Sequence, residues 1–183
     1  MMNQIWITLL GIGVGALLGG VISALTSRYA AFKEAKGIAA ALHSEIGSIL
    51  RMIERRQYVE GMMVVIARLT NPAYVPNAND VPSISVTQDY FSVFHATASK
   101  IGLLGELSGR VTGLYVLGKG LIEDLITLRR WHEEGIPPPR VELFELLQAV
   151  RYLFEAVRTD GAAVMAKLDE FASNRHRWLC LFP

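Results

Sequence analysis

The strongest hydrophobic pattern in this chain is an almost unbroken run of apolar and small residues from Ile5 to Leu25. No charged side chain occurs before Arg28. Because a helix rises about 1.5 Å per residue, this run covers roughly the 30 Å of hydrocarbon in a bilayer and satisfies its own backbone hydrogen bonds. The pattern predicts one transmembrane helix.

Two other interpretations of this run fit less well. A secretory signal has a basic start and an apolar core of about 7–15 residues, whereas Met1 to Gln4 holds no Lys or Arg and the run is longer. Gly11 to Ala16 has the G-x-G-x-x-A form of a dinucleotide-binding loop, with Glu34 at about the distance of a ribose-binding acid. That loop requires a βαβ unit, and the residues that follow have a helical pattern with no second strand.

Small residues form a row along the predicted transmembrane helix. Gly11, Gly15, Gly19 and Ser23 are four residues apart and therefore share one face. In lipid, close van der Waals packing along such a smooth face favours helix association. The row predicts a packing face for another membrane helix, from a second copy of the chain or from a different subunit.

Beyond the span, apolar residues recur at intervals of three and four, and no proline occurs before Pro72. The transmembrane helix is therefore expected to run on as one rod from about Ile5 to Leu69. Asn71 to Pro82 holds three prolines together with Asn and Asp, which predicts a loop.

Three further helices are predicted after this loop. The first begins at a capping box, Ser85 to Gln88, and ends at Gly102. The second follows an apolar stripe from Leu107 to Trp131 and is closed by Gly135. The last runs from about Arg140 to Ser173. The expected fold is all-α, with the transmembrane helix continuing into an antiparallel bundle of about four helices.

The positions of the charges predict an orientation. All 18 Lys and Arg residues follow the span, and Arg28, Lys33 and Lys36 lie just beyond it. The positive-inside rule then places the carboxy-terminal part in the cytoplasm of a bacterium and the amino terminus outside its inner membrane. The expected divisions are a transmembrane helix at 1–27, a cytoplasmic bundle at 28–174 and an amphipathic tail at 175–183.

The overall charge excludes one class of partner. The 18 basic and 17 acidic side chains nearly cancel, which argues against a nucleic-acid footprint and for an ordinary globular body. Cys180 is the only cysteine, so an intrachain disulfide is impossible, as suits a reducing compartment.

Two segments carry a family resemblance. They are Ala39 to Ile46 (AAALHSEI) and Phe91 to Leu104 (FSVFHATASKIGLL), and a helix that bears Tyr115 follows the second. From the span to about Trp131, the chain resembles a group of uncharacterised bacterial single-pass membrane proteins. The resemblance implies a membrane-anchored helical architecture and brings with it no activity, ligand or site residue.

One glycine-rich segment has the spacing of a phosphate-binding loop. Gly113 to Gly120 matches a P-loop through Lys119, but Gly120 replaces the hydroxyl residue that would hold Mg²⁺, and the segment lies in a helical stripe. Gly105, Gly109 and Gly113 are again four apart. We therefore expect them to let this helix pack tightly against its neighbours, in return for their low helix propensity.

Chemistry-bearing residues do not form a recognisable catalytic set. A di-iron bundle needs Glu-x-x-His on two helices, and no histidine here has Glu three residues before it. The residues that come closest to a metal-ligand set are His43, Glu45 and His95, and no metal or cofactor is expected. The carboxylate pairs Glu142 with Glu145 and Asp169 with Glu170 are interpreted as solvated faces.

The carboxy-terminal tail has the composition of a segment that lies in a membrane interface. Arg175, Arg177 and Trp178 precede an apolar cluster that includes Phe182. The alternative is that the tail folds back onto the bundle core.

Three classes of function remain open. The leading hypothesis is a membrane-anchored interaction or accessory subunit with no catalysis of its own. The second is a sensor or effector, in phage defence or stress response, that couples the bilayer to the cytoplasm. The third is an enzyme with a metal or nucleotide site in the bundle.

Overall fold

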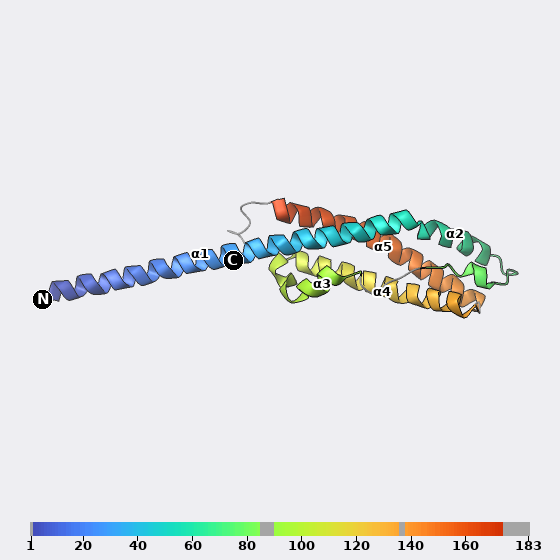
Figure 1. Cartoon of the computed structure of the whole chain (residues 1–183), viewed down its shortest axis with the longest axis horizontal. Coiled ribbons are helices and arrows are strands. Elements are labelled where there is room, and N and C mark those ends of the chain that lie inside the picture. Colours follow the sequence, from blue (N-terminus) through green and yellow to red (C-terminus); the bar gives the residue numbers. More distant parts are fainter. Residues whose placement is uncertain (1, 85–89, 136–137, 174–183) are drawn as a thin grey trace.

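The computed structural model describes residues 2–84, 90–135 and 138–173, and it describes side-chain surroundings from Ile12 onward, apart from Ala78. Five α-helices and two short 3₁₀ helices account for nearly all of these residues, and no strand occurs among them. The all-α prediction is therefore confirmed. The first half of α1 projects away from the other helices, which gather along its second half (Figure 1).

Helix α1 spans Met2–Arg56 without a break. It joins the apolar run to Phe32, Ala35, Ile38, Ala39, Leu42 and Ile46, which are all buried in the core. The predicted continuation beyond the span is thus correct as far as Arg56.

The prediction of one continuous helix as far as Leu69 is wrong, because the helix is interrupted at one residue. Gln57 has φ 48° and ψ 34°, the left-handed conformation, and α2 (Tyr58–Leu69) begins after it. The bend keeps Met62, Ile66 and Leu69 buried, and α2 lies against α5. Tertiary packing of α2 on α5 therefore outweighs the local helical pattern here.

The predicted loop after α2 is held around one buried carboxylate. Asp80, only 1% exposed, ends the 3₁₀ helix η1 (Ala78–Asp80). It accepts hydrogen bonds from the Tyr74 hydroxyl at 2.8 and 2.9 Å and from the Asn77 N–H at 2.9 Å, and Arg68 lies 3.5 Å away. These donors satisfy the charge that burial would otherwise penalise.

The next helix differs from its prediction at its end. Helix α3 covers Ser92–Thr97, and a 3₁₀ helix, η2, follows it directly and covers Ala98–Leu104. The chain leaves this helix at Gly105, with φ 61°, and not at Gly102. The capping box at residues 85–88 lies outside the described residues.

Helices α4 (Leu107–Glu134) and α5 (Arg140–Ser173) match their predicted bounds closely, and Gly135 ends α4 in the left-handed conformation expected of a terminating glycine. Helix α5 contacts α1, α2 and α4. It runs opposite in direction to both α1 and α4 (Figure 1). The side chain of Arg140 also donates to the Leu69 carbonyl at 2.7 Å, which ties the end of α2 to the start of α5.

Small residues let α1 and α5 approach each other closely. A Cβ added at Gly161 would lie 3.2 Å from Leu50, and one added at Gly47 would lie 3.1 Å from Met165. At the other end of this contact, the Phe32 and Phe171 rings lie 6.4 Å apart. This pair of helices therefore packs closely along its length.

We predict that Gln57→Gly raises the free energy of unfolding by about 0.5–1 kcal/mol, because glycine adopts the left-handed conformation without the steric cost that glutamine bears. Urea unfolding followed by circular dichroism measures this change. The matched control is Glu54→Gly, in a regular part of α1, which should instead lower stability by about 1 kcal/mol. Equal losses of stability in the two variants would contradict the left-handed conformation of Gln57.

Candidate functional site

The first part of α1 is an apolar surface that no other part of the described chain covers. Its large apolar side chains are exposed on every side of the helix, for example Ile12 (65%), Leu17 (71%) and Ile22 (62%). By length and composition, α1 is the one described helix that could cross a membrane. A soluble protein rarely leaves so large an apolar surface uncovered.

The predicted glycine face lies within this segment. A Cβ added at Gly15 or Gly19 would meet no atom within 4 Å, and Ser23 is exposed. Gly11 belongs to the same helix, although its surroundings are outside the described part. The face is therefore open along its described length, and its pairing with another helix stays a prediction.

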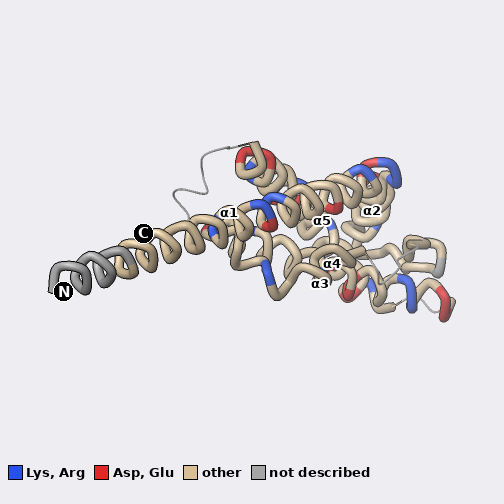
Figure 2. Tube along the Cα trace, turned by 60° about the vertical axis from the view of Figure 1, so that its left-hand side comes forward, with Lys and Arg blue, Asp and Glu red and all other residues tan. Residues whose placement is uncertain are grey.

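Charged side chains first occur on α1 where the other helices start to pack against it. In Figure 2 the projecting part of α1 carries no blue or red, and both colours appear where the remaining helices lie against it. Lys100 of η2 pairs with Glu34 of α1 close to this boundary. The apolar and the charged parts of the molecule are thus separated along one helix.

A second feature is a hydrogen-bonded junction centred on Glu45 of α1. Its carboxylate accepts the backbone N–H groups of Val93 at 2.7 Å and Phe94 at 3.2 Å, and the Tyr115 hydroxyl at 2.5 Å. The first two belong to α3 and the third to α4. One half-buried side chain therefore joins three helices.

Aromatic rings close the apolar side of this junction. The Phe94 ring stacks on Tyr115 at 4.0 Å, and the Phe91 ring meets Tyr115 edge-on at 5.1 Å. Burial of the Tyr115 hydroxyl, together with its hydrogen bond to Glu45, raises its pKa well above the ordinary value. Tyr115 is neutral at physiological pH, and its hydroxyl donates to the Glu45 carboxylate.

The hydrogen bonds of Glu45 also decide whether it can act as one of the predicted metal ligands. Both Glu45 oxygens are engaged by backbone and hydroxyl donors. Within the described residues, no group of three His, Cys, Asp or Glu side chains is placed to hold a metal ion. His95 is on α3, where its ring packs edge-on against Phe94, and His43 is on α1. The structure therefore does not bring this trio together as a site.

The second glycine series has no close neighbour within the described chain, so its role as a packing face stays a prediction. A Cβ added at Gly105, Gly109 or Gly113 would meet nothing within 4 Å. Gly105 instead serves the turn before α4, where its positive φ is needed. The glycine of α4 with a close neighbour is Gly118, where an added Cβ would lie 2.7 Å from the Phe91 ring.

Other sequence candidates have ordinary surroundings. Gly113 to Gly120 is regular helix and forms no phosphate-binding loop. Glu142, Glu145, Asp169 and Glu170 are all exposed, as predicted. The tail residues Arg175, Arg177, Trp178 and Phe182 lie outside the described residues.

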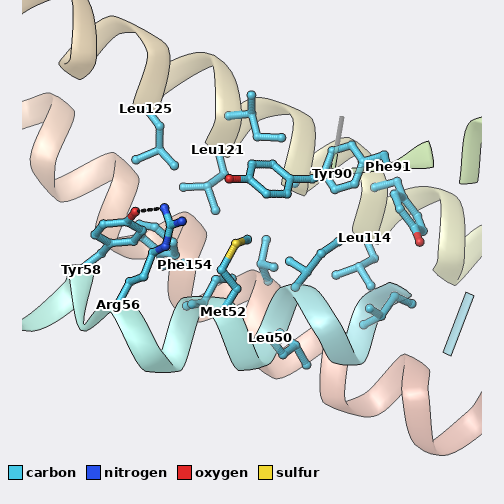
Figure 3. A pocket seen from close by; sticks show the side chains of 17 residues that line it. Leu50, Met52, Arg56, Tyr58, Tyr90, Phe91, Leu114, Leu121, Leu125 and Phe154 are labelled. Atoms are coloured by element: carbon cyan, nitrogen blue, oxygen red, sulfur yellow. Dashed lines mark hydrogen bonds between the residues drawn. The ribbon is translucent and has the colours of Figure 1, made fainter. Parts of the chain in front are cut away.

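The feature that the sequence pattern did not reveal is an apolar cavity between α1, α4 and α5 (Figure 3). Its volume is about 70 Å³. A void of this size costs on the order of 1–2 kcal/mol of stability in an apolar core. The side chains that line it include Leu114, Leu121, Leu125, Phe154 and Val157.

One end of this cavity is polar. Arg56 donates to the Tyr58 hydroxyl at 2.6 Å, at the point where Gln57 breaks the helix (Figure 3). That hydrogen bond raises the pKa of the Arg56 guanidinium. Among the described lining residues, Arg56 is the one that is exposed; Met52, Tyr58 and Tyr90 are half-buried. The cavity therefore meets solvent beside a fixed positive charge.

Comparison with protein-family models, with curated proteins and with solved structures finds no match. The geometry of the chain itself is therefore the basis for a proposed function.

We predict that Glu45→Gln lowers the free energy of unfolding by about 1–3 kcal/mol, because an amide offers one acceptor oxygen where the carboxylate uses both of its oxygens. The matched control is Glu34→Gln, which removes an exposed ion pair to the same α3–η2 segment and should cost less than about 1 kcal/mol. Urea unfolding measures both. Similar losses for the two variants would show that Glu45 is not the anchor of this segment.

Proposed function

We propose that the protein is a single-pass membrane protein that acts as an interaction or accessory subunit of a bacterial inner-membrane assembly, without catalysis of its own. The observation that carries this proposal is the continuity of α1. Its exposed apolar half and its buried core half form one unbroken helix. Whatever covers the first half is thereby held at a fixed distance and direction from the helical body.

The charge distribution supports one orientation in this proposal. Arg28, Lys33 and Lys36 follow the apolar segment directly, whereas no charged side chain precedes it. Positive-inside placement then holds the helical bundle in the cytoplasm and the amino terminus outside.

The open glycine face supports a partner inside the membrane. Gly15, Gly19 and Ser23 leave a smooth strip on the first part of α1, where no described segment of the chain covers the helix. Such a strip lets a second helix approach closely enough for extensive van der Waals contact. We propose that a second copy or a different membrane subunit packs there.

A sensor or effector role is the second candidate, and the same helix favours it. Because α1 has no break before Gln57, a rotation or tilt imposed in the bilayer would be carried to the Glu45 junction, where α3 and α4 are attached. In that case disrupting the glycine face changes signalling without changing protein abundance.

We predict that Leu17→Arg moves a large share of the protein from the membrane pellet to the supernatant after alkaline extraction, because an arginine at the centre of a span costs about 2.5–3.5 kcal/mol. The matched control is Val116→Arg, at an exposed apolar position of α4, which should remain in the pellet.

The orientation is tested with an impermeant maleimide added to spheroplasts. It should label Cys180, the only cysteine, only after permeabilisation. Wild-type protein in the supernatant, or labelling of intact spheroplasts, would contradict the proposal.

We predict that Gly15→Leu/Gly19→Leu lowers the yield of crosslinked membrane adducts at least about fivefold, because the leucines separate the two helix backbones. The measurement is crosslinking in native membranes followed by mass spectrometry. Gly13→Leu is the matched control, since residue 13 lies on the opposite side of the helix. Equal yields in both variants would count against the glycine face.

A further inference from the structure

The volume and the lining of the apolar cavity indicate which kind of ligand it could bind. Its volume of about 70 Å³ is roughly half that of an apolar cavity of about 150 Å³ known to admit benzene. The cavity therefore has room for the end of a narrow alkyl chain better than for a ring. Its walls are apolar side chains of α1, α4 and α5, so a dry hydrocarbon is the matching occupant.

A groove lined by arginines of α1 adjoins the Arg56 end of the cavity. This groove of about 420 Å³ is lined by Ser48, Arg51, Met52, Arg55 and Arg56. Met52 and Arg56 line both spaces, so the two adjoin at these side chains. Arg51 donates to Ser48 at 3.1 Å, and no Asp or Glu is among the groove's described lining residues.

This combination matches an amphiphile with a negative head. Guanidinium groups bind carboxylates and phosphates through strong, charge-assisted hydrogen bonds. The hydrogen bond from Arg56 to Tyr58 holds one guanidinium beside the cavity exit. An anionic head in the groove would therefore leave its apolar chain directed into the cavity.

The position of the cavity along α1 points to a single-chain amphiphile. Arg56 is about 44 Å along the helix from Ser27, at the standard rise per residue. On the proposed membrane anchoring, a two-chain lipid held in that bilayer cannot reach the cavity. A single-chain acid can reach it, because it can leave the membrane as a monomer.

We propose that the cavity and the groove together bind a single-chain anionic amphiphile of the fatty-acid type. The alkyl end occupies the space between Leu114, Leu121 and Phe154. The head lies against Arg51, Arg55 and Arg56.

The probe for this site is a 12-carbon fatty acid that carries a diazirine near its methyl end. It is added to a cell lysate that lacks ATP and contains both membranes and soluble proteins, so that it is not built into phospholipid and meets the full-length protein in either fraction. After irradiation, the protein is purified and the modified peptides are identified by mass spectrometry. We expect adducts at cavity-lining residues of α1, α4 and α5.

Variants separate the two parts of the site. Arg51→Gln/Arg56→Gln should lower the yield of cavity adducts about tenfold or more, because it removes charge-assisted hydrogen bonds to the head. Arg110→Gln, at an exposed arginine of α4 that lines neither space, is the matched control and should leave the yield unchanged. Leu121→Phe should fill the cavity and also lower the yield, with its melting temperature compared with that of the wild type to show that it folds.

Competing probes test the class of ligand. An unlabelled 12-carbon acid should displace the probe, whereas the 12-carbon alcohol and a two-chain phosphatidylglycerol should displace it at least about tenfold less well. Adducts confined to residues 5–25 would show that the probe only marks lipid around α1 and would overturn the site. Displacement by the alcohol as effectively as by the acid would overturn the role of the arginines. Either result leaves the extraction and labelling tests of the proposed anchoring unaffected, so the two failures can be told apart.

Discussion

The structure depends on one constraint: helix α1 has to satisfy two different surroundings with a single backbone. Its first half exposes apolar side chains on all sides, and its second half is buried against α5. The helical hydrogen-bond pattern satisfies the backbone in both surroundings, so the helix passes from one to the other without a break. Only the side chains change character, from uncharged to amphipathic, near Arg28.

The seam between α1 and α5 and the junction at Glu45 hold the remaining elements on this helix. Close approach at Gly161 and Gly47 lets α5 lie along α1, and the carboxylate of Glu45 attaches both α3 and α4. The aromatic residues that pack beside this carboxylate also form part of the cavity wall, because Phe91 and Tyr115 line it. The position of α1, the α3 segment and the cavity are therefore physically linked.

Much of the fold could be predicted from periodicity. The bounds of α4 and α5 follow from their apolar stripes and from Gly135, because those signals are local. The break at Gln57 could not be predicted, since nothing about a glutamine favours the left-handed conformation. The break arises from contacts of α2 with α5, which are remote in sequence. Likewise, Gly109 and Gly113 have the spacing of a packing face, yet α4 turns that face away from the described chain.

The chain by itself determined the helical class, the uncharged apolar segment and the point at which charges begin, because each depends on residue type and spacing along one helix. Only the tertiary structure decided that Glu45 accepts hydrogen bonds from α3 and α4, that Gly118 lies beneath Phe91, and that an apolar cavity opens beside Arg56. Those features depend on which faces of α1, α4 and α5 meet. That choice is made by packing between residues far apart in the sequence, and no local pattern records it.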